Sequence, residues 1–205
     1  LKEDQIIIDE CRLNGGYINY FTDLQSKTNL DIFPASEPDS LTEESQDFIY
    51  GIDLMMLKFN DVSVNYTDLT QGMFAELNGL NVSAKGKMKG ENIVGNVKMS
   101  LRDIAYQQTT DSLSMAVKLN DLKLEGDADM RGDDIKADIE ASSSVLCYES
   151  EGQAASLNSF NIKFKGDVND YDKIKGNAEM SVNDLSFVMD EQQLLNNADL
   201  RMILP

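Results

Sequence analysis

The absence of histidine limits the chemistry that this chain of 205 residues could perform. Without it there is no Ser-His-Asp or Cys-His nucleophile, no His-ligated zinc site, and no access to the commonest general base. The two cysteines, Cys11 and Cys147, have a spacing that matches no metal motif. If side chains alternate along strands, these two cysteines face opposite sides of a sheet, and that geometry disfavours a disulfide between them.

Carboxylates are the remaining candidates for catalysis or metal binding. Asp127 and Asp129 could form a glycosidase pair, but alternation places both on a polar face beside a turn, and the chain has no tryptophan as a sugar platform. The stretch from Asp167 to Asp172 is similar in its acidic residues to a calcium loop, but it lacks the glycine and the distal glutamate of such loops. We interpret it as a hairpin. The sequence therefore predicts no enzyme activity, no catalytic residue, no metal site and no cofactor.

The charge of the chain also excludes a class of partner. Thirty-six acidic residues against eighteen basic ones give a formal net charge of −18. This charge repels phosphate backbones and anionic headgroups, so we exclude nucleic acid as a partner. We interpret the acidic residues as a solvated face that keeps a β-rich protein soluble.

A short motif recurs along the chain and marks its unit of construction. It consists of an apolar residue, usually Asn, a turn-forming residue, and then apolar residues at alternate positions, as in Phe59-Asn60-Asp61-Val62. Further copies are Leu13-Asn14-Gly15-Gly16, Leu77-Asn78-Gly79-Leu80, Leu101-Arg102-Asp103-Ile104, Leu119-Asn120-Asp121-Leu122, Leu157-Asn158-Ser159-Phe160, Val182-Asn183-Asp184-Leu185 and Leu195-Asn196-Asn197-Ala198, with a degenerate copy at Ser143-Ser144-Val145-Leu146.

Between the motifs, apolar residues alternate with polar ones. Val97, Met99 and Leu101 share one parity while Lys98 and the other polar residues take the opposite one, which is typical of a sheet with one dry and one wet face. Glycines and hairpin turns recur about every 40 residues. We therefore predict an all-β fold with little helix: a long antiparallel meander, roughly 20 residues per strand, curled into a trough or a flattened barrel.

The motif also suggests how neighbouring strands pair. If Leu77 pairs with Leu101, and Leu101 with Leu119, the hairpin turns fall at positions 89 and 110, where turn-forming residues occur. If Leu157 pairs with Val182, the turn falls near position 170. The motif then lies at one level on every strand.

The parity of the apolar residues changes at each motif, because Leu101 is odd-numbered whereas Ile104 is even-numbered. One extra residue in a strand is a β-bulge, and Asn, Asp and Gly tolerate the backbone angles that it needs. We predict bulges at Asn60-Asp61, Arg102-Asp103, Asn120-Asp121 and Asn183-Asp184. Bulges at one level would crease the sheet, with the apolar face inside.

We interpret the chain as one β-repeat domain, 1–205, with a long irregular insertion at 24–47 that contains two prolines. A short helix at 40–46 is an alternative for part of it. The chain begins without Met, shows no signal peptide, and has no apolar run near the ~18 residues of a membrane span. We expect either a mature exported protein or a piece of a longer one.

The apolar side chains of this sheet have no downstream helix to cover them. Their fate stays open: the two wings close into an ordinary core, another segment or subunit docks, or the trough holds an apolar ligand. Tyr20, Tyr66, Tyr106 and Tyr148 are expected to stack across neighbouring strands, with their hydroxyls at the sheet edge. The candidate groove-lining residues are Leu80, Val82, Val97, Met99, Leu122, Leu124, Ile135, Ile139, Phe160, Ile162, Ile174 and Met180.

Serial motifs of the 59–66 kind, joined by short acidic hairpins, resemble the periplasmic β-groove repeats of AsmA-like proteins, relatives of TamB. The resemblance covers 1–23 and 48–205. It implies an envelope protein of diderm bacteria, tethered to the inner membrane by a segment absent from this chain, with a groove linked to outer-membrane biogenesis and phospholipid transport.

On this basis we expect a non-enzymatic periplasmic segment that binds or guides lipid acyl chains. The expected partners are those acyl chains, and other β-repeats of the same parent chain or envelope assembly proteins. The alternative is a structural or protein-interaction scaffold for outer-membrane protein assembly, without bound lipid.

Overall fold

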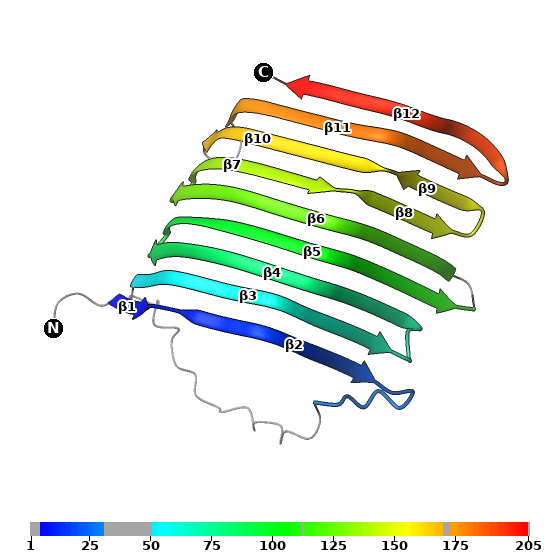
Figure 1. Cartoon of the computed structure of the whole chain (residues 1–205), viewed down its shortest axis with the longest axis horizontal. Coiled ribbons are helices and arrows are strands. Elements are labelled where there is room, and N and C mark those ends of the chain that lie inside the picture. Colours follow the sequence, from blue (N-terminus) through cyan, green and yellow to red (C-terminus); the bar gives the residue numbers. More distant parts are fainter. Residues whose placement is uncertain (1–4, 31–50, 112, 170–172, 205) are drawn as a thin grey trace.

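The computed structural model describes residues 5–30, 51–111, 113–169 and 173–204, and these form one sheet of twelve strands (Figure 1). No helix occurs among the described residues, so the all-β prediction is confirmed. The strands are β1 (Gln5–Ile8), β2 (Cys11–Thr22), β3 (Gly51–Asp68), β4 (Met73–Lys89), β5 (Asn92–Thr110), β6 (Leu113–Arg131), β7 (Asp134–Ser143), β8 (Val145–Ser150), β9 (Gln153–Leu157), β10 (Ser159–Asn169), β11 (Lys173–Met189) and β12 (Gln192–Leu204).

Four of the shorter strands are halves of two longer ones. Strands β7 and β8 both pair with β6, and the register continues from one to the other without a shift. Strands β9 and β10 pair in the same way with β11. From β3 onward the sheet is therefore an antiparallel meander of long strands, each joined to the next by a hairpin.

The first strand departs from the antiparallel arrangement. Strands β1 and β2 run parallel to β3, with Gln5 opposite Gly51 and Thr22 opposite Asp68. Because parallel neighbours need a connection that returns to the other end of the sheet, a long segment must separate them. The expected insertion at 24–47 provides that length. Its residues 24–30 form a turn closed by a bridge between Thr22 and Thr28, whereas the rest, with the alternative helix at 40–46, lies outside the described residues.

The motif lies at one level across β4 to β11, as expected, but its pairing differs from the prediction. Leu77 pairs with Ile104 instead of Leu101, and Leu101 pairs with Leu122 instead of Leu119. The same correction applies to Val182, which pairs with Phe160 instead of Leu157. On antiparallel neighbours the motif runs in opposite directions, so its first apolar residue meets the last apolar residue of the next copy.

Three of the four predicted bulge sites have the backbone conformation that the argument requires. Asp61, Asp121 and Asp184 have φ angles of 51°, 52° and 54°, in the left-handed region that Asp tolerates better than most residues. Among the four sites, a register shift accompanies only Asp61 and Asp184, so the predicted bulge was wrong for Asn120-Asp121. It was also wrong for Arg102-Asp103, because the positive φ at this level belongs to Gly79 on the neighbouring strand. The ladder between β4 and β5 is interrupted here, between the pairs Asn78–Asp103 and Asn81–Ser100.

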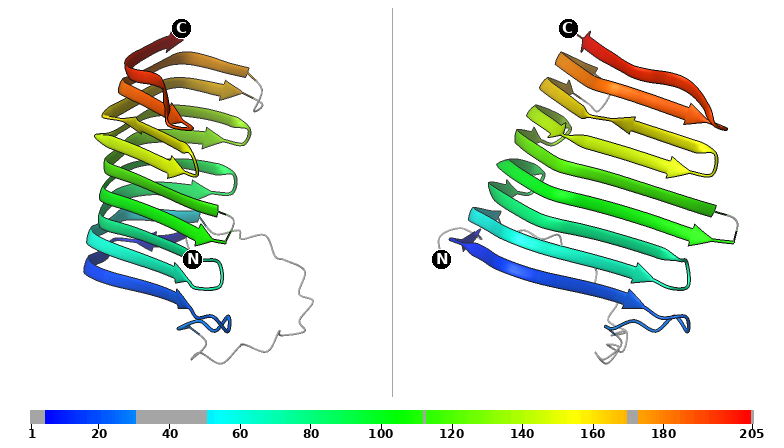
Figure 2. Two further views of the ribbon diagram at one scale, coloured as in Figure 1. Left: turned by 90° about the vertical axis from the view of Figure 1, so that its right-hand side faces the viewer. Right: turned by 45° about the vertical axis from the view of Figure 1, so that its right-hand side comes forward.

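The interruption does not shift the register between β4, β5 and β6, because both strands of each pair change parity at the same level. Register shifts occur only toward the two sides of the sheet, between β3 and β4 and between β11 and β12. The side chains thus return to the same face after each motif, and the sheet bends into a trough whose two wings are visible in Figure 2.

A row of small residues is a second feature that lies at one level across the strands, and we call it the small-residue row. Directly paired neighbours across six strands contribute Gly86, Gly95, Ala128, Ala137, Gly166 and Gly176. A Cβ atom at Gly166 would lie 2.4 Å from the carbonyl oxygen of Lys175 and 2.8 Å from the Cα of Gly176. Neighbouring backbones therefore approach here more closely than larger side chains would permit.

This close approach predicts different outcomes at two glycines. Gly166→Ala must push backbone apart and should lower the free energy of unfolding by about 1–3 kcal/mol. In Gly126→Ala the nearest atoms lie 3.3 Å from the new Cβ, so they need move only slightly, and the free energy of unfolding should fall by less than about 1 kcal/mol. Urea unfolding of both variants checks this, and equal effects would contradict the role of the small-residue row.

Candidate functional site

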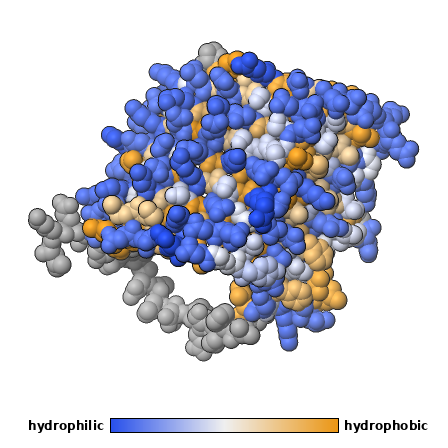
Figure 3. Space-filling model, viewed as in Figure 1, coloured by the Kyte–Doolittle hydropathy of each residue, from blue (hydrophilic) through white to orange (hydrophobic). Residues whose placement is uncertain are grey.

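All twelve candidate groove residues lie on one face of the sheet. Directly paired residues share a face, and one level row contains Val82, Met99, Leu124, Ile162 and Met180, joined through Ala141. The other candidates lie at even steps from this row along their strands. We call this side the inner face, because the view of Figure 1 looks onto the convex side of the trough, and there hydrophilic residues predominate (Figures 2 and 3).

The inner face does not close into an ordinary core. Among the described residues, only Val62 and Leu101 are buried apolar side chains, with 2% and 5% of their surface exposed. Ile139, Ile162 and Ile174 remain 39%, 43% and 69% exposed, and the other nine candidates are half-buried. Among the described residues the two wings thus stay apart, which disfavours the alternative of a closed, ordinary core.

The apolar surface continues beyond the motif, where we had named few candidates. Val64, Leu77, Ile104, Leu119 and Leu146 follow one another as direct pairs across β3 to β8. Without the change of parity, these residues would point to the opposite face. The signal was present in the sequence, because each motif has an apolar residue on both sides of its polar centre.

The tyrosines form a level row but stack only once. Tyr20 and Tyr66 are stacked, with ring centroids 5.3 Å apart and planes inclined by 2°. Ala75 separates Tyr66 from Tyr106, and Val117 separates Tyr106 from Tyr148, so the predicted stacking was wrong for these two. The Tyr66 hydroxyl donates to Asp68, the last residue of β3, at 3.4 Å. Burial, together with the charge of Asp68, raises the pKa of Tyr66.

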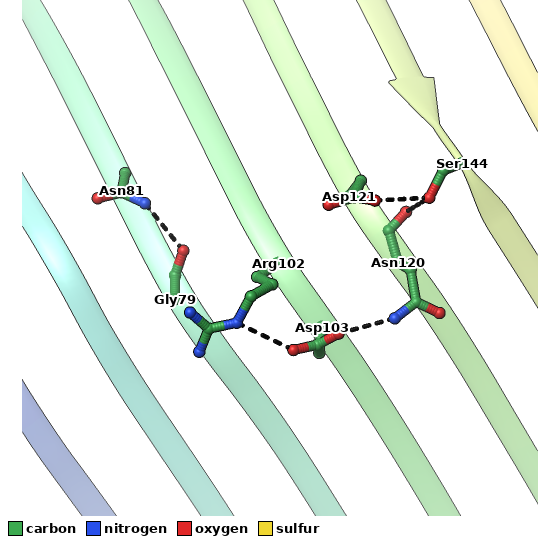
Figure 4. A network of polar contacts seen from close by, with 7 residues as sticks. All are labelled: Gly79, Asn81, Arg102, Asp103, Asn120, Asp121 and Ser144. Atoms are coloured by element: carbon green, nitrogen blue, oxygen red, sulfur yellow. Dashed lines mark hydrogen bonds and ion pairs between the residues drawn. The ribbon is translucent and has the colours of Figure 1, made fainter.

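Polar side chains bridge the strands at the level where the ladder is interrupted (Figure 4). The Asn120 amide donates to Asp103 at 2.7 Å, and the Ser144 hydroxyl donates to Asp121 at 2.8 Å. Asn60 donates to Asn14 on β2 at 2.5 Å in the same way. We call this level set of Asn, Asp and Ser residues the polar belt. Asn81 of this belt also pairs backbone groups where the ladder is interrupted, because it accepts from the Asp61 amide and donates to the Gly79 carbonyl, both at 3.0 Å.

The outer face carries charges of both signs. Ion pairs join Lys98 to Glu125 at 2.5 Å, Lys163 to Glu140 at 3.0 Å, and Lys165 to Asp138 at 2.6 Å. Glu125 and Glu140 are directly opposite each other, and each is compensated by the lysine on its other side. A hollow of about 810 Å³ lies among these charges, but lysines and aspartates alternate around it, so it favours no ligand charge.

The residues considered for catalysis are not arranged for it. Asp127 and Asp129 lie on the outer face, and a hydrogen bond from Arg131 lowers the pKa of Asp129. A general acid needs the opposite shift. Both cysteines are free, with Cys11 opposite Leu57 on the inner face and Cys147 opposite Lys118 on the outer one.

The described residues contain neither a group of metal ligands nor a membrane-spanning helix. Within 5–30, 51–111, 113–169 and 173–204, no three Cys, Asp or Glu side chains are grouped as metal ligands would be. The acidic stretch 167–172 lies partly outside these ranges. The described part of the chain contains no helix able to cross a membrane.

The left-handed conformation at the polar belt predicts a difference between two valine substitutions. Asp121→Val places a β-branched residue at φ 52°, at a cost of roughly 1–2 kcal/mol, and removes the hydrogen bond from Ser144, worth about 1 kcal/mol. Lys123→Val, two residues further along the same strand, should change the free energy of unfolding by less than about 0.5 kcal/mol. Urea unfolding compares them, and similar losses would show that the belt is dispensable.

No protein-family model, curated protein or solved structure matches this chain. The resemblance to AsmA-like proteins rests on the repeated motif alone. The geometry of the two faces is therefore the basis of the function proposed below.

Proposed function

We propose that this chain is a non-enzymatic lipid-binding segment whose inner face holds or guides phospholipid acyl chains. We further propose, on the resemblance to AsmA-like proteins, that it acts in the periplasm, in outer-membrane biogenesis, with a tether to the inner membrane outside this chain. The observation that carries the proposal is the continuous, half-exposed apolar surface along the inside of the trough.

An apolar ligand would lower the free energy of this surface. Monomeric proteins rarely expose contiguous apolar patches beyond about 300–600 Å². Full burial of an Ile or Leu side chain is worth about 1.5–3 kcal/mol, so covering a half-exposed one gains roughly 1 kcal/mol. Ile139 and Ile162 are two of many such side chains on the inner face. The trough therefore favours a ligand that has no polar groups along most of the ligand's own length.

The shape of the sheet favours a lipid over a small enclosed ligand. The trough is open along one side (Figure 2), so an acyl chain can lie on the inner face while its headgroup remains in water. The ion-paired outer face keeps the protein in solution without covering the inner face.

The edge strands favour the alternative, a scaffold that binds other β-repeats of the same parent chain or envelope assembly proteins. Among the described strands, β12 pairs only with β11, and Leu194, Leu200 and Ile203 on it are 53%, 48% and 55% exposed. An unpaired edge can accept a further strand through backbone hydrogen bonds. This scaffold function needs no lipid, so the two proposals are separable by experiment.

Substitutions on the two faces test lipid binding. Ile139→Asp and Ile162→Asp should each weaken binding of a fluorescent phosphatidylcholine at least about tenfold, because a carboxylate meets the acyl chain. Both side chains are half-exposed, so the new charge reaches water and avoids the several kcal/mol of a buried, unpaired charge. Urea unfolding should accordingly show modest losses of stability.

Phe74→Asp is the matched control, because Phe74 is 45% exposed and lies on the outer face, opposite Thr67 and Gln107. It should leave binding unchanged. Inner-face variants that unfold, from a parent protein that never bound the probe, would refute the lipid proposal and favour the scaffold.

A further inference from the structure

The inner face is not uniformly lined, because the small-residue row leaves a strip without large side chains. A furrow of about 500 Å³ lies over this strip. Met88 and Ile93 border it on one side, and Val97 and Ile139 on the other. The furrow runs across β3 to β7, along the axis of the trough, because its floor of Gly86, Gly95 and Ala128 consists of directly paired residues. The small-residue row continues past the furrow to Gly176 on β11.

We propose that this furrow is the track of a single acyl chain of a zwitterionic phospholipid, with the methyl end toward β3. This inference rests on the proposed function and specifies where, and in which direction, the lipid lies. Six strands at 4.7–4.9 Å spacing make the small-residue row about 24 Å long. One leaflet of a bilayer core is about 15 Å thick, so an extended acyl chain fits within that length.

The width and the lining of the furrow select an unbranched hydrocarbon. The two bordering rows are four residues apart along each strand, about 13 Å between Cα atoms, and the side chains of Met88, Ile93, Val97 and Ile139 narrow the space between them. The floor carries only Gly and Ala, whose backbone groups pair within the sheet. A bound peptide would therefore bury polar groups without partners in the furrow, whereas a hydrocarbon has none to satisfy.

The direction follows from the β3 end of the row. Leu54 pairs with Gly86 and is the only large side chain at this level among the strands from β3 to β11. It also lines the furrow and so closes that end. The methyl end of the chain lies against Leu54, and the headgroup lies toward Gly176 on β11. The formal charge of −18 favours a zwitterionic headgroup over the carboxylate of a free fatty acid.

Photolabelling of the wild-type protein tests the placement. Phosphatidylcholine with a diazirine near the methyl end of one chain, delivered in small vesicles, should label peptides that contain Leu54, Met88 and Ile93. A diazirine near the carbonyl should label peptides around Phe164 and Ile174. Labels spread evenly over the inner face, or concentrated beyond the polar belt near Leu119 and Leu146, would overturn the furrow, and a reversed pattern would overturn the direction.

Filling the furrow tests it independently. The double variant Ala128→Leu, Ala137→Leu keeps the inner face apolar but occupies the floor. It should bind phosphatidylcholine at least about tenfold more weakly, because the added atoms take the place of about two methylene groups of the chain. Ala105→Leu adds the same group to the outer face, opposite Glu76 and Lys118, and should bind like the wild type.

The outcomes separate this inference from the proposed function. Equal binding by the wild type and both variants would overturn the furrow and leave the lipid-binding function standing, as would equal losses in both variants. No binding by the wild type would overturn both. Oleate bound as tightly as phosphatidylcholine would overturn the preference for a zwitterionic headgroup. If the double variant fails to fold in urea-unfolding controls, the photolabelling of the wild type decides.

Discussion

The structure depends on a change of parity at one level on neighbouring strands, made on β3, β4, β6 and β11 by a residue in the left-handed conformation. Asp61, Gly79, Asp121 and Asp184 supply it, and each shifts the alternation of its strand by one residue. A strand without such a shift would carry its apolar residues to the outer face beyond this level. Because neighbouring strands shift together, the sheet keeps its register while it bends, and one continuous apolar face results.

That face explains why the fold has almost no conventional core. With only Val62 and Leu101 buried among the apolar residues described, the sheet must be held by backbone ladders, cross-strand contacts and the polar belt. A protein that leaves so much apolar surface half-exposed violates the usual pattern of burial, and such violations are expected where function requires them. A trough that binds acyl chains requires an exposed apolar face, whereas a self-filled module does not.

Much of this architecture could be predicted from the sequence, because alternation and hairpin turns depend on local preferences. The level of the motif followed from its spacing, but its pairing did not, since we paired like positions and overlooked that antiparallel neighbours reverse the motif. The parallel first strand could not be inferred from the repeat, because Leu13-Asn14-Gly15 fits a parallel or an antiparallel neighbour equally well. It is the long connection before Gly51 that permits the parallel arrangement.

The candidate face was located correctly in half of its extent. Residues such as Val97 and Ile139 stood out by their alternation, whereas Leu77, Leu119 and Leu146 required the parity change to be followed through the motif. The small-residue row was also readable in principle, since Gly86 and Gly95 are equidistant from their hairpin turn. What it does depends on backbone approach between strands, as at Gly166 and Gly176, and this is a property of the folded sheet.

The central claim is that the inner face is covered by lipid when the protein is in its native setting. The most direct measurement is mass spectrometry of lipids extracted from protein that was purified without detergent. The account predicts phospholipid in near-stoichiometric amount, depleted in the folded Ile139→Asp variant and retained in Phe74→Asp. Folded wild-type protein that carries no lipid, and takes none up from vesicles, would contradict it.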